Sequence, residues 1–154
     1  MTTAPRFSPR QGADAVVIGA SAGGVHALLT LLGCLPAGFE PAVLAVLHVP
    51  ASQPSGVAEL MAGVCALPVR EALDKQPIAG GVVVFAPADY HLLVEPGRTL
   101  ALSVDAPVHY SRPAIDPLFE SAAEVFGERL LALVLTGANG DGAEGLLAVR
   151  RCGG

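Results

Sequence analysis

The chain has 154 residues, of which 52% are hydrophobic and 15% charged, and its formal net charge is −5. This length and composition predict one globular domain with a sizeable core. The acidic balance argues against nucleic acid as a partner, and no apolar run approaches the roughly 18 residues that a membrane span requires.

The first half of the chain alternates short apolar runs with helical patterns. Residues 1–13 are polar and contain two prolines, and we expect a disordered tail there. The apolar runs predict buried strands at 14–19 and 42–49 and a shorter strand at 67–72. Helical patterns occupy 23–32 and 56–64, with a polar turn at 52–55 before the second.

The second half adds two more buried strands, at 81–86 and 129–136, and a hairpin at 91–95 and 99–103 around Pro96-Gly97. Asp116-Pro117 predicts a helix start with Asp116 as its N-cap, and a last helix is expected at 143–151. This alternation predicts an α/β fold with a doubly wound, mostly parallel sheet and helices on both faces. With the hairpin it makes a three-layer, Rossmann-like domain over residues 14–154.

A serine stands in a glycine-rich turn after the first predicted strand. The segment 19–24 reads GASAGG and is followed by a helical pattern, which is the layout of a nucleophile elbow around Ser21. A dinucleotide-binding fingerprint fails here, because Ser21 stands where its second glycine belongs. A serine that merely caps the helix remains an alternative.

Three polar side chains follow strands of the predicted sheet. In such sheets, sites form beyond the carboxyl ends of the strands, which selects Ser21, His48 and Asp141. A hydroxyl, an imidazole and a carboxylate are the groups that acyl transfer requires. The loop at 137–142 is glycine-rich, so its N–H groups can point inward as an oxyanion hole requires, although a plain flexible turn is the alternative.

The remaining histidines and Asp116 fit the site less well. His26 is expected to point away from Ser21 by helical phase, and His91 and His109 are candidates for surface histidines. Asp116 is better explained as a helix cap.

The cysteines and the first residues of the sequence indicate the cellular compartment that we expect for this protein. Cys34, Cys65 and Cys152 are widely spaced and form no C-x-x-C pair, which favours free thiols over a disulfide framework or a zinc site. The first residues also lack the apolar core of a secretory signal. We therefore expect a cytoplasmic protein without a metal.

Five segments together resemble the catalytic domain of the CheB-type chemotaxis methylesterases. They are VVIGASAGG at 16–24, LAVLHVP at 44–50, VFAPADYHLLV at 84–94, SRPAIDPLFESAA at 111–123 and LVLTGANGDGA at 133–143. They follow the family's order and span the chain from about residue 14 to 152, which makes the resemblance specific.

The resemblance implies hydrolysis of γ-glutamyl methyl esters on chemoreceptors, with possible deamidation of receptor glutamines and no cofactor. Carried over by motif, Ser21 is the nucleophile, His48 the base and Asp141 the orienting acid. Ala22 and Ala138 match positions beside the oxyanion site, and Arg112 is a candidate substrate-binding residue in the segment 111–123. The implied partner is a methylated chemoreceptor, without membrane insertion.

The sequence departs from the family in three places. Ala22 stands where threonine is common, the loop at 137–143 reads GANGDGA where the family more often has a methionine and the order Gly-Asn-Asp, and no receiver domain precedes residue 14. Control by a separate receiver or kinase protein is one possibility. The altered residues motivate an alternative hypothesis, a catalytically weak or silent module that binds a receptor or signalling partner. A general small-ester hydrolase is a third hypothesis.

The end of the chain carries one more expectation. Residues 143–154 are expected to form a helix and its glycine cap, and such a helix normally returns to another parallel strand. We therefore expect further strands beyond this point and an unpaired apolar edge at 129–136 in their absence.

Overall fold

The computed structural model describes residues 12–48, 56–137 and 139–154. Its strands are β1 (Ala15–Ala20), β2 (Ala42–Leu47), β3 (Val69–Glu71), β4 (Val83–Phe85), β5 (His91–Glu95), β6 (Thr99–Ser103) and β7 (Leu130–Thr136). Its helices are α1 (Val25–Gly33), α2 (Val57–Ala62), α3 (Ile115–Phe126) and α4 (Ala143–Arg151), with 3-10 turns η1 (Ala22–Gly24) and η2 (Gly127–Arg129). Most of the predicted tail and the predicted turn at 52–55 lie outside the described residues.

Within the described residues, five strands form one parallel sheet in the order β3-β4-β2-β1-β7. The chain moves outward from β1 to β2 on one side and later returns to β7 on the other side of β1. Such a reversal is a topological switch point, where open α/β sheets form their sites. The ends of β1, β2 and β7 meet there, since Ala20 pairs with Leu47 on one side and with Thr136 on the other.

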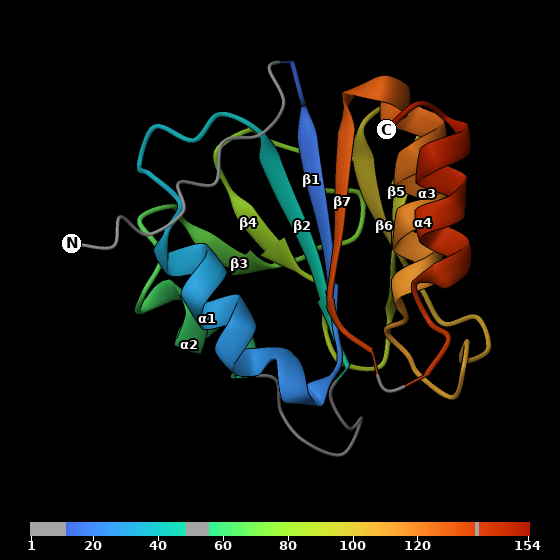
Figure 1. Ribbon diagram of the computed structural model, residues 1–154, viewed down its shortest axis with the longest axis horizontal. Helices are drawn as coiled ribbons and strands as arrows, with labels where there is room; N and C mark the ends of the chain where they lie inside the picture. The colour runs from blue at the N-terminus through green and yellow to red at the C-terminus, as the bar shows by residue number, and fades with distance from the viewer. Residues whose placement is uncertain (1–11, 49–55, 138) are drawn as a thin grey trace.

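The central strands are buried on both faces, and their alternate residues face two separate cores. Val17 and Leu44 pack with the β5–β6 hairpin and with α3 and α4, whereas Val16 and Val43 pack with α1 and α2. Figure 1 shows α1 and α2 on one side of the sheet and α3, α4 and the hairpin on the other. The predicted three-layer α/β fold, including the antiparallel hairpin, is therefore confirmed.

The start of α3 corrects one prediction. Ala114 occupies the N-cap position, and Asp116 lies inside the first turn of α3. The prediction that Asp116 caps its own helix is wrong. Pro117 does not prevent the earlier start, because the first four N–H groups of a helix have no partner within it.

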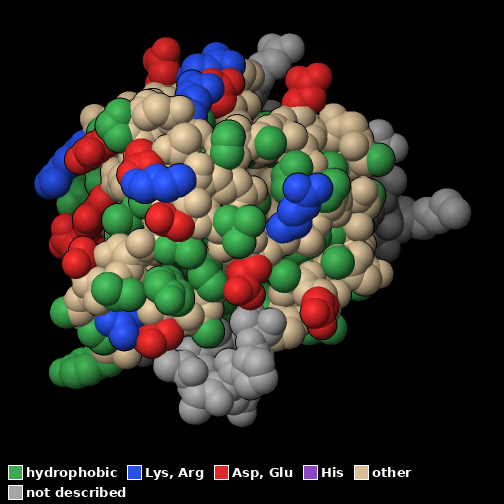
Figure 2. Space-filling view, turned by 180° about the vertical axis from the view of Figure 1, so that it is seen from behind, with side chains coloured by type: hydrophobic (Ala, Val, Ile, Leu, Met, Phe, Trp, Pro, Cys, Tyr) green, Lys and Arg blue, Asp and Glu red, His purple; other side chains and the backbone are tan. Residues whose placement is uncertain are grey.

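β7 forms one edge of the described sheet and pairs with β1. Figure 2 shows acidic and basic side chains interspersed on the face seen from behind. No helix in the described part of the chain is both long and apolar enough to cross a membrane.

Candidate active site

Ser21 follows β1 directly and begins the turn η1. Its backbone is extended, with φ −79° and ψ 172°, and its side chain makes no capping hydrogen bond to the turn. The residue is 8% exposed, and its Oγ lies 2.8 Å from the Oγ1 of Thr136. The interpretation of Ser21 as a helix cap therefore has no support from its hydrogen bonds.

His48 follows β2 and continues the pairing with β1, since its N–H donates to the carbonyl of Ala20 over 3.0 Å. Its ring Nε2 lies 2.7 Å from Oδ2 of Asp141, a residue on the loop after β7. The His48 side chain is 15% exposed and that of Asp141 is fully buried. Parallel pairing of β2, β1 and β7 is what brings these two loops together.

Asp141 accepts hydrogen bonds from three donors. Oδ2 accepts from His48 and from the N–H of Ile115 at 2.7 Å, and Oδ1 accepts from the N–H of Asp116 at 2.9 Å. The last two donors belong to the first turn of α3, whose dipole favours a negative charge. Burial by itself raises the pKa of the Asp141 carboxyl, but the bonds from His48, Ile115 and Asp116 outweigh burial and hold the pKa below its ordinary value.

The lowered pKa of Asp141 predicts a stability change in acid. The unfolded chain binds this proton at a pH where the folded chain does not, so the carboxylate stabilises the fold above about pH 4. That contribution is lost as the pH falls through the folded pKa. Urea unfolding between pH 6 and 3 should show a steeper fall for the wild type than for Asp141→Asn. Parallel curves for the two proteins would contradict this prediction.

Asp116 lies in α3 and accepts hydrogen bonds from the start of α4, just as Asp141, before α4, accepts hydrogen bonds from the start of α3. Its Oδ1 accepts from the N–H groups of Gly142 and Gly145, both over 2.8 Å, at the start of α4. Its Oδ2 lies 3.5 Å from Nε2 of His109. Asp141 thus holds the start of α3 while Asp116 holds the start of α4. Gly142 has φ 105°, a conformation that favours glycine.

Replacing Asp116 with alanine should destabilise the protein by about 2 to 4 kcal/mol, because two buried N–H groups lose their acceptor. Asp116→Asn is the matched control, since its amide oxygen can still accept both bonds. The measurement is the free energy of urea unfolding of the three proteins. Equal values for wild type and Asp116→Ala would show that this connection contributes nothing.

The two halves of the predicted triad are not joined by a hydrogen bond. In the described residues, Ser21 Oγ bonds to Thr136, and no hydrogen bond joins it to the His48 ring. In free enzymes such bonds are often long and tighten only when substrate binds. Thr136 was missed by sequence reasoning, although it is the one polar residue of the apolar run LLALVLT and stands at its carboxyl end.

The other predicted site residues lie as follows. Ala22 is exposed in η1, directly after Ser21, and Ala138 lies outside the described residues. Arg112 donates to Asp89 and to the carbonyls of Val104 and Asp105, so its guanidinium ties the loop before α3 to the loop after β4. None of these bonds reaches the residues of the predicted triad.

The histidines outside the site differ from one another. His91 is 2% exposed, so the prediction of a surface histidine is wrong for it. Its Nδ1 accepts from the N–H of Ala114 and its Nε2 donates to the carbonyl of Ala106, which assigns it to the packing before α3. His26 is exposed on α1, and the side chain of His109 is 43% exposed beside Asp116.

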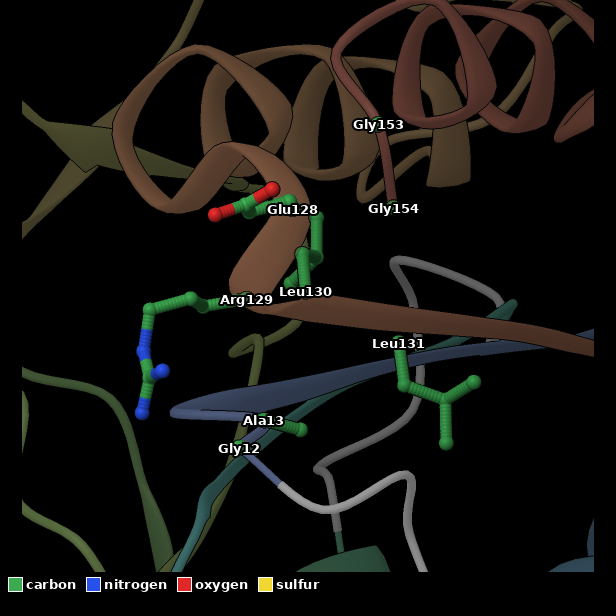
Figure 3. A pocket seen from close by; sticks show the side chains of 8 residues that line it. All are labelled: Gly12, Ala13, Glu128, Arg129, Leu130, Leu131, Gly153 and Gly154. Carbon is green, nitrogen blue, oxygen red and sulfur yellow. The ribbon is translucent and has the colours of Figure 1, made fainter.

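A recess of about 550 Å³ lies at the opposite end of the sheet (Figure 3). Its lining residues come from just before β1, from the start of β7 and the residues just before it, and from the end of the chain. They are Gly12, Ala13, Glu128, Arg129, Leu130, Leu131, Gly153 and Gly154. The Arg129 guanidinium is paired with Asp14 at 2.8 Å. None of the predicted site residues lines this recess.

Comparisons with known proteins give a consistent result. The family model described as CheB methylesterase matches residues 16–154. A protein of Leptospira interrogans named putative protein-glutamate methylesterase/protein-glutamine glutaminase is 41% identical over 92% of this chain and 73% of its own length. A Rhodospirillum rubrum protein-glutamate methylesterase/protein-glutamine glutaminase is 40% identical over 92% of this chain and 38% of its own length.

A solved structure agrees with the sequence comparisons. The crystal structure of the Thermotoga maritima CheB methylesterase catalytic domain superposes with a TM-score of 0.87 at 32% identity. The match covers 92% of this chain and 77% of that one. By its sequence and by its fold, over most of its length, this chain belongs to the CheB methylesterase family.

Proposed function

We propose that this protein hydrolyses glutamyl γ-methyl esters on chemoreceptors through a Ser-His-Asp triad of Ser21, His48 and Asp141. The family and the names of the relatives support methylester hydrolysis. The observation that carries the triad is the 2.7 Å bond between His48 and the buried Asp141, with Ser21 at the end of the adjacent strand. Receptor glutamines are a second substrate in this proposal, since an amide carbonyl undergoes the same attack.

The hydrogen bonds of Asp141 define the protonation of the base. An ionised carboxylate only accepts, so the Nε2 that faces it carries a hydrogen. In the neutral imidazole, Nδ1 is then the acceptor and is the atom that takes the proton of Ser21. As His48 becomes positively charged, the buried carboxylate stabilises it.

The reaction then has two halves. Ser21 Oγ attacks the ester carbonyl while its proton passes to His48, and the same proton leaves with methanol as the C–O bond breaks. A water molecule attacks the acyl-enzyme with His48 again as base, which releases the receptor glutamate and restores Ser21. No step requires a metal or an organic cofactor.

Three residues complete the proposal with secondary roles. Ala22 follows the nucleophile and, with Ala138, is our candidate for the oxyanion side. The methyl group of Ala22 offers no hydroxyl, so any contribution comes from its backbone. Arg112 is the candidate substrate-binding residue, and its bonds to Asp89 and Val104 support a role in holding the loop before α3.

A second candidate function is a receptor-binding module that hydrolyses weakly or not at all. The observation in its favour is that Ser21 bonds to Thr136 and not to His48 in the described residues. Such a module would dock a chemoreceptor, and a separate receiver or kinase protein would be its signalling partner. The free thiols of Cys34, Cys65 and Cys152 suit the cytoplasmic location that we propose in either case.

The test is methanol release from a methylated chemoreceptor signalling fragment, run beside a small chromogenic ester. The proposed function predicts release from the receptor with formation of the corresponding glutamate. Receptor binding without release would favour the binding module. Hydrolysis of the small ester alone would indicate a general esterase and would contradict the proposed substrate.

A further inference from the structure

We propose that Thr136 is a further catalytic residue, whose hydroxyl donates a hydrogen bond to Ser21 Oγ as Ser21 loses its proton. This inference rests on the proposed function, because it assigns a task within the same attack. The two hydroxyl oxygens are 2.8 Å apart, and Thr136 Oγ1 also accepts from the Ser21 N–H at 3.1 Å. The backbone N–H and the hydroxyl of Ser21 are therefore both held by one side chain.

An irregularity in the sheet aligns the two residues. β1 and β7 pair in register up to Gly19 and Val134, but the next pair is Ala20 with Thr136. Leu135 is thus an extra residue on β7, which is the pattern of a β-bulge. Bulges re-aim the side chains that follow them, and this one brings Thr136 beside the residue before the nucleophile.

A glycine keeps the space for the Thr136 hydroxyl. A Cβ at Gly24 would lie 2.5 Å from Thr136 Oγ1 and 2.8 Å from Cβ of Ala20. The N–H of Gly24 donates to the carbonyl of Ser21 over 2.8 Å, which folds the turn back onto β1 and β7. The glycine-rich turn therefore accommodates Thr136 as well as shaping the bend around Ser21.

The hydrogens of the two hydroxyl groups show how Thr136 can act during the attack by Ser21. In this structure Thr136 Oγ1 accepts both the Ser21 N–H and the Ser21 hydroxyl. Its own hydroxyl hydrogen can donate to Ser21 Oγ once the Ser21 hydroxyl hydrogen turns to His48. When the Ser21 Oγ–H bond breaks, the proton goes to Nδ1 of His48 and the Oγ electron pair forms the bond to the carbonyl carbon. Ser21 Oγ can then only accept, and Thr136 is the side chain within hydrogen-bond distance in the described part of the chain. Thr136 keeps its own proton throughout.

The opposing interpretation is that Thr136 only fills space at the end of β7. Thr136→Val and Thr136→Ser separate the two, because valine keeps the shape without the hydroxyl and serine keeps the hydroxyl without the methyl group. Removing a hydrogen bond to the nucleophile oxygen as it loses its proton should lower kcat by about tenfold or more. We expect a loss of that size in Thr136→Val with little change in KM, and a kcat within a few-fold of wild type in Thr136→Ser.

The experiment measures kcat and KM for methyl-ester hydrolysis and, separately, the rate at which a fluorophosphonate labels Ser21. Melting temperatures verify folding, and Thr136→Ala replaces Thr136→Val if the valine variant does not fold. A slow Thr136→Val with an active Thr136→Ser supports the inference. A Thr136→Val within about threefold of wild type overturns it, as does a Thr136→Ser that is equally slow.

Failure of the proposed function is distinguished by the labelling reaction. If the wild type releases no methanol from receptor but labels at Ser21, the substrate is wrong, and the labelling rates of the variants still decide the role of Thr136. If the wild type neither releases methanol nor labels, Ser21 is not activated and both proposals are overturned.

Discussion

Replacing Ser21 with alanine is expected to lower kcat for ester hydrolysis by about a millionfold, the size of effect seen when a triad nucleophile is removed. The variant loses the atom that attacks the carbonyl, and no acyl-enzyme can form. The fold should be nearly unaffected, since the change removes one hydrogen bond to Thr136, which is worth about 0.5 to 1.5 kcal/mol. The measurements are methanol release and the melting temperature.

Ser103→Ala is the matched control for this experiment. It removes the same atom from a serine at the end of β6, where the hydroxyl accepts the N–H of Asp105. Among the described residues, no hydrogen bond joins this hydroxyl to the proposed triad. The activity of Ser103→Ala should equal that of the wild type. Activity retained in a purified, folded Ser21→Ala would exclude Ser21 as the nucleophile.

Asp141→Asn is expected to lower kcat by up to about 10⁴-fold, by analogy with the equivalent change in other triads. The carboxylate accepts from three donors, and an asparagine offers one oxygen and one NH₂ group in its place. An NH₂ group at the position of Oδ2 would face the donors of His48 and Ile115, and at the position of Oδ1 it would face the N–H of Asp116. In the first orientation the imidazole is driven to the tautomer with hydrogen on Nδ1, which cannot take the proton of Ser21. In both orientations the negative charge that stabilises protonated His48 is lost.

The matched control for this change is Asp105→Asn, at an exposed residue whose backbone carbonyl, not its carboxylate, accepts from Arg112. The comparison measures kcat and KM for both variants. A near-neutral Asp141→Asn, with another aspartate variant inactive, would show that a different residue is the acid.

Most of the fold could be predicted because its signals are local. The buried strands are continuous apolar runs, as in β1 and β2, and helical periodicity and turn residues separate them. The rule that sites form beyond the carboxyl ends of parallel strands then selected Ser21, His48 and Asp141 from the polar residues. A hydrogen bond joins two of these three residues, His48 and Asp141.

What the sequence by itself determined is therefore the order of the elements and the loops that carry the candidate site. Only the tertiary structure decided which side chain forms hydrogen bonds with which distant part of the chain. Asp116 has the sequence of a cap for α3, yet it binds the start of α4. His91 has no local signal of burial, yet it is packed before α3. Thr136 reaches Ser21 through a one-residue bulge between strands. These contacts join residues from 23 to 115 positions apart, and local patterns do not encode them because they form only when separate elements pack together.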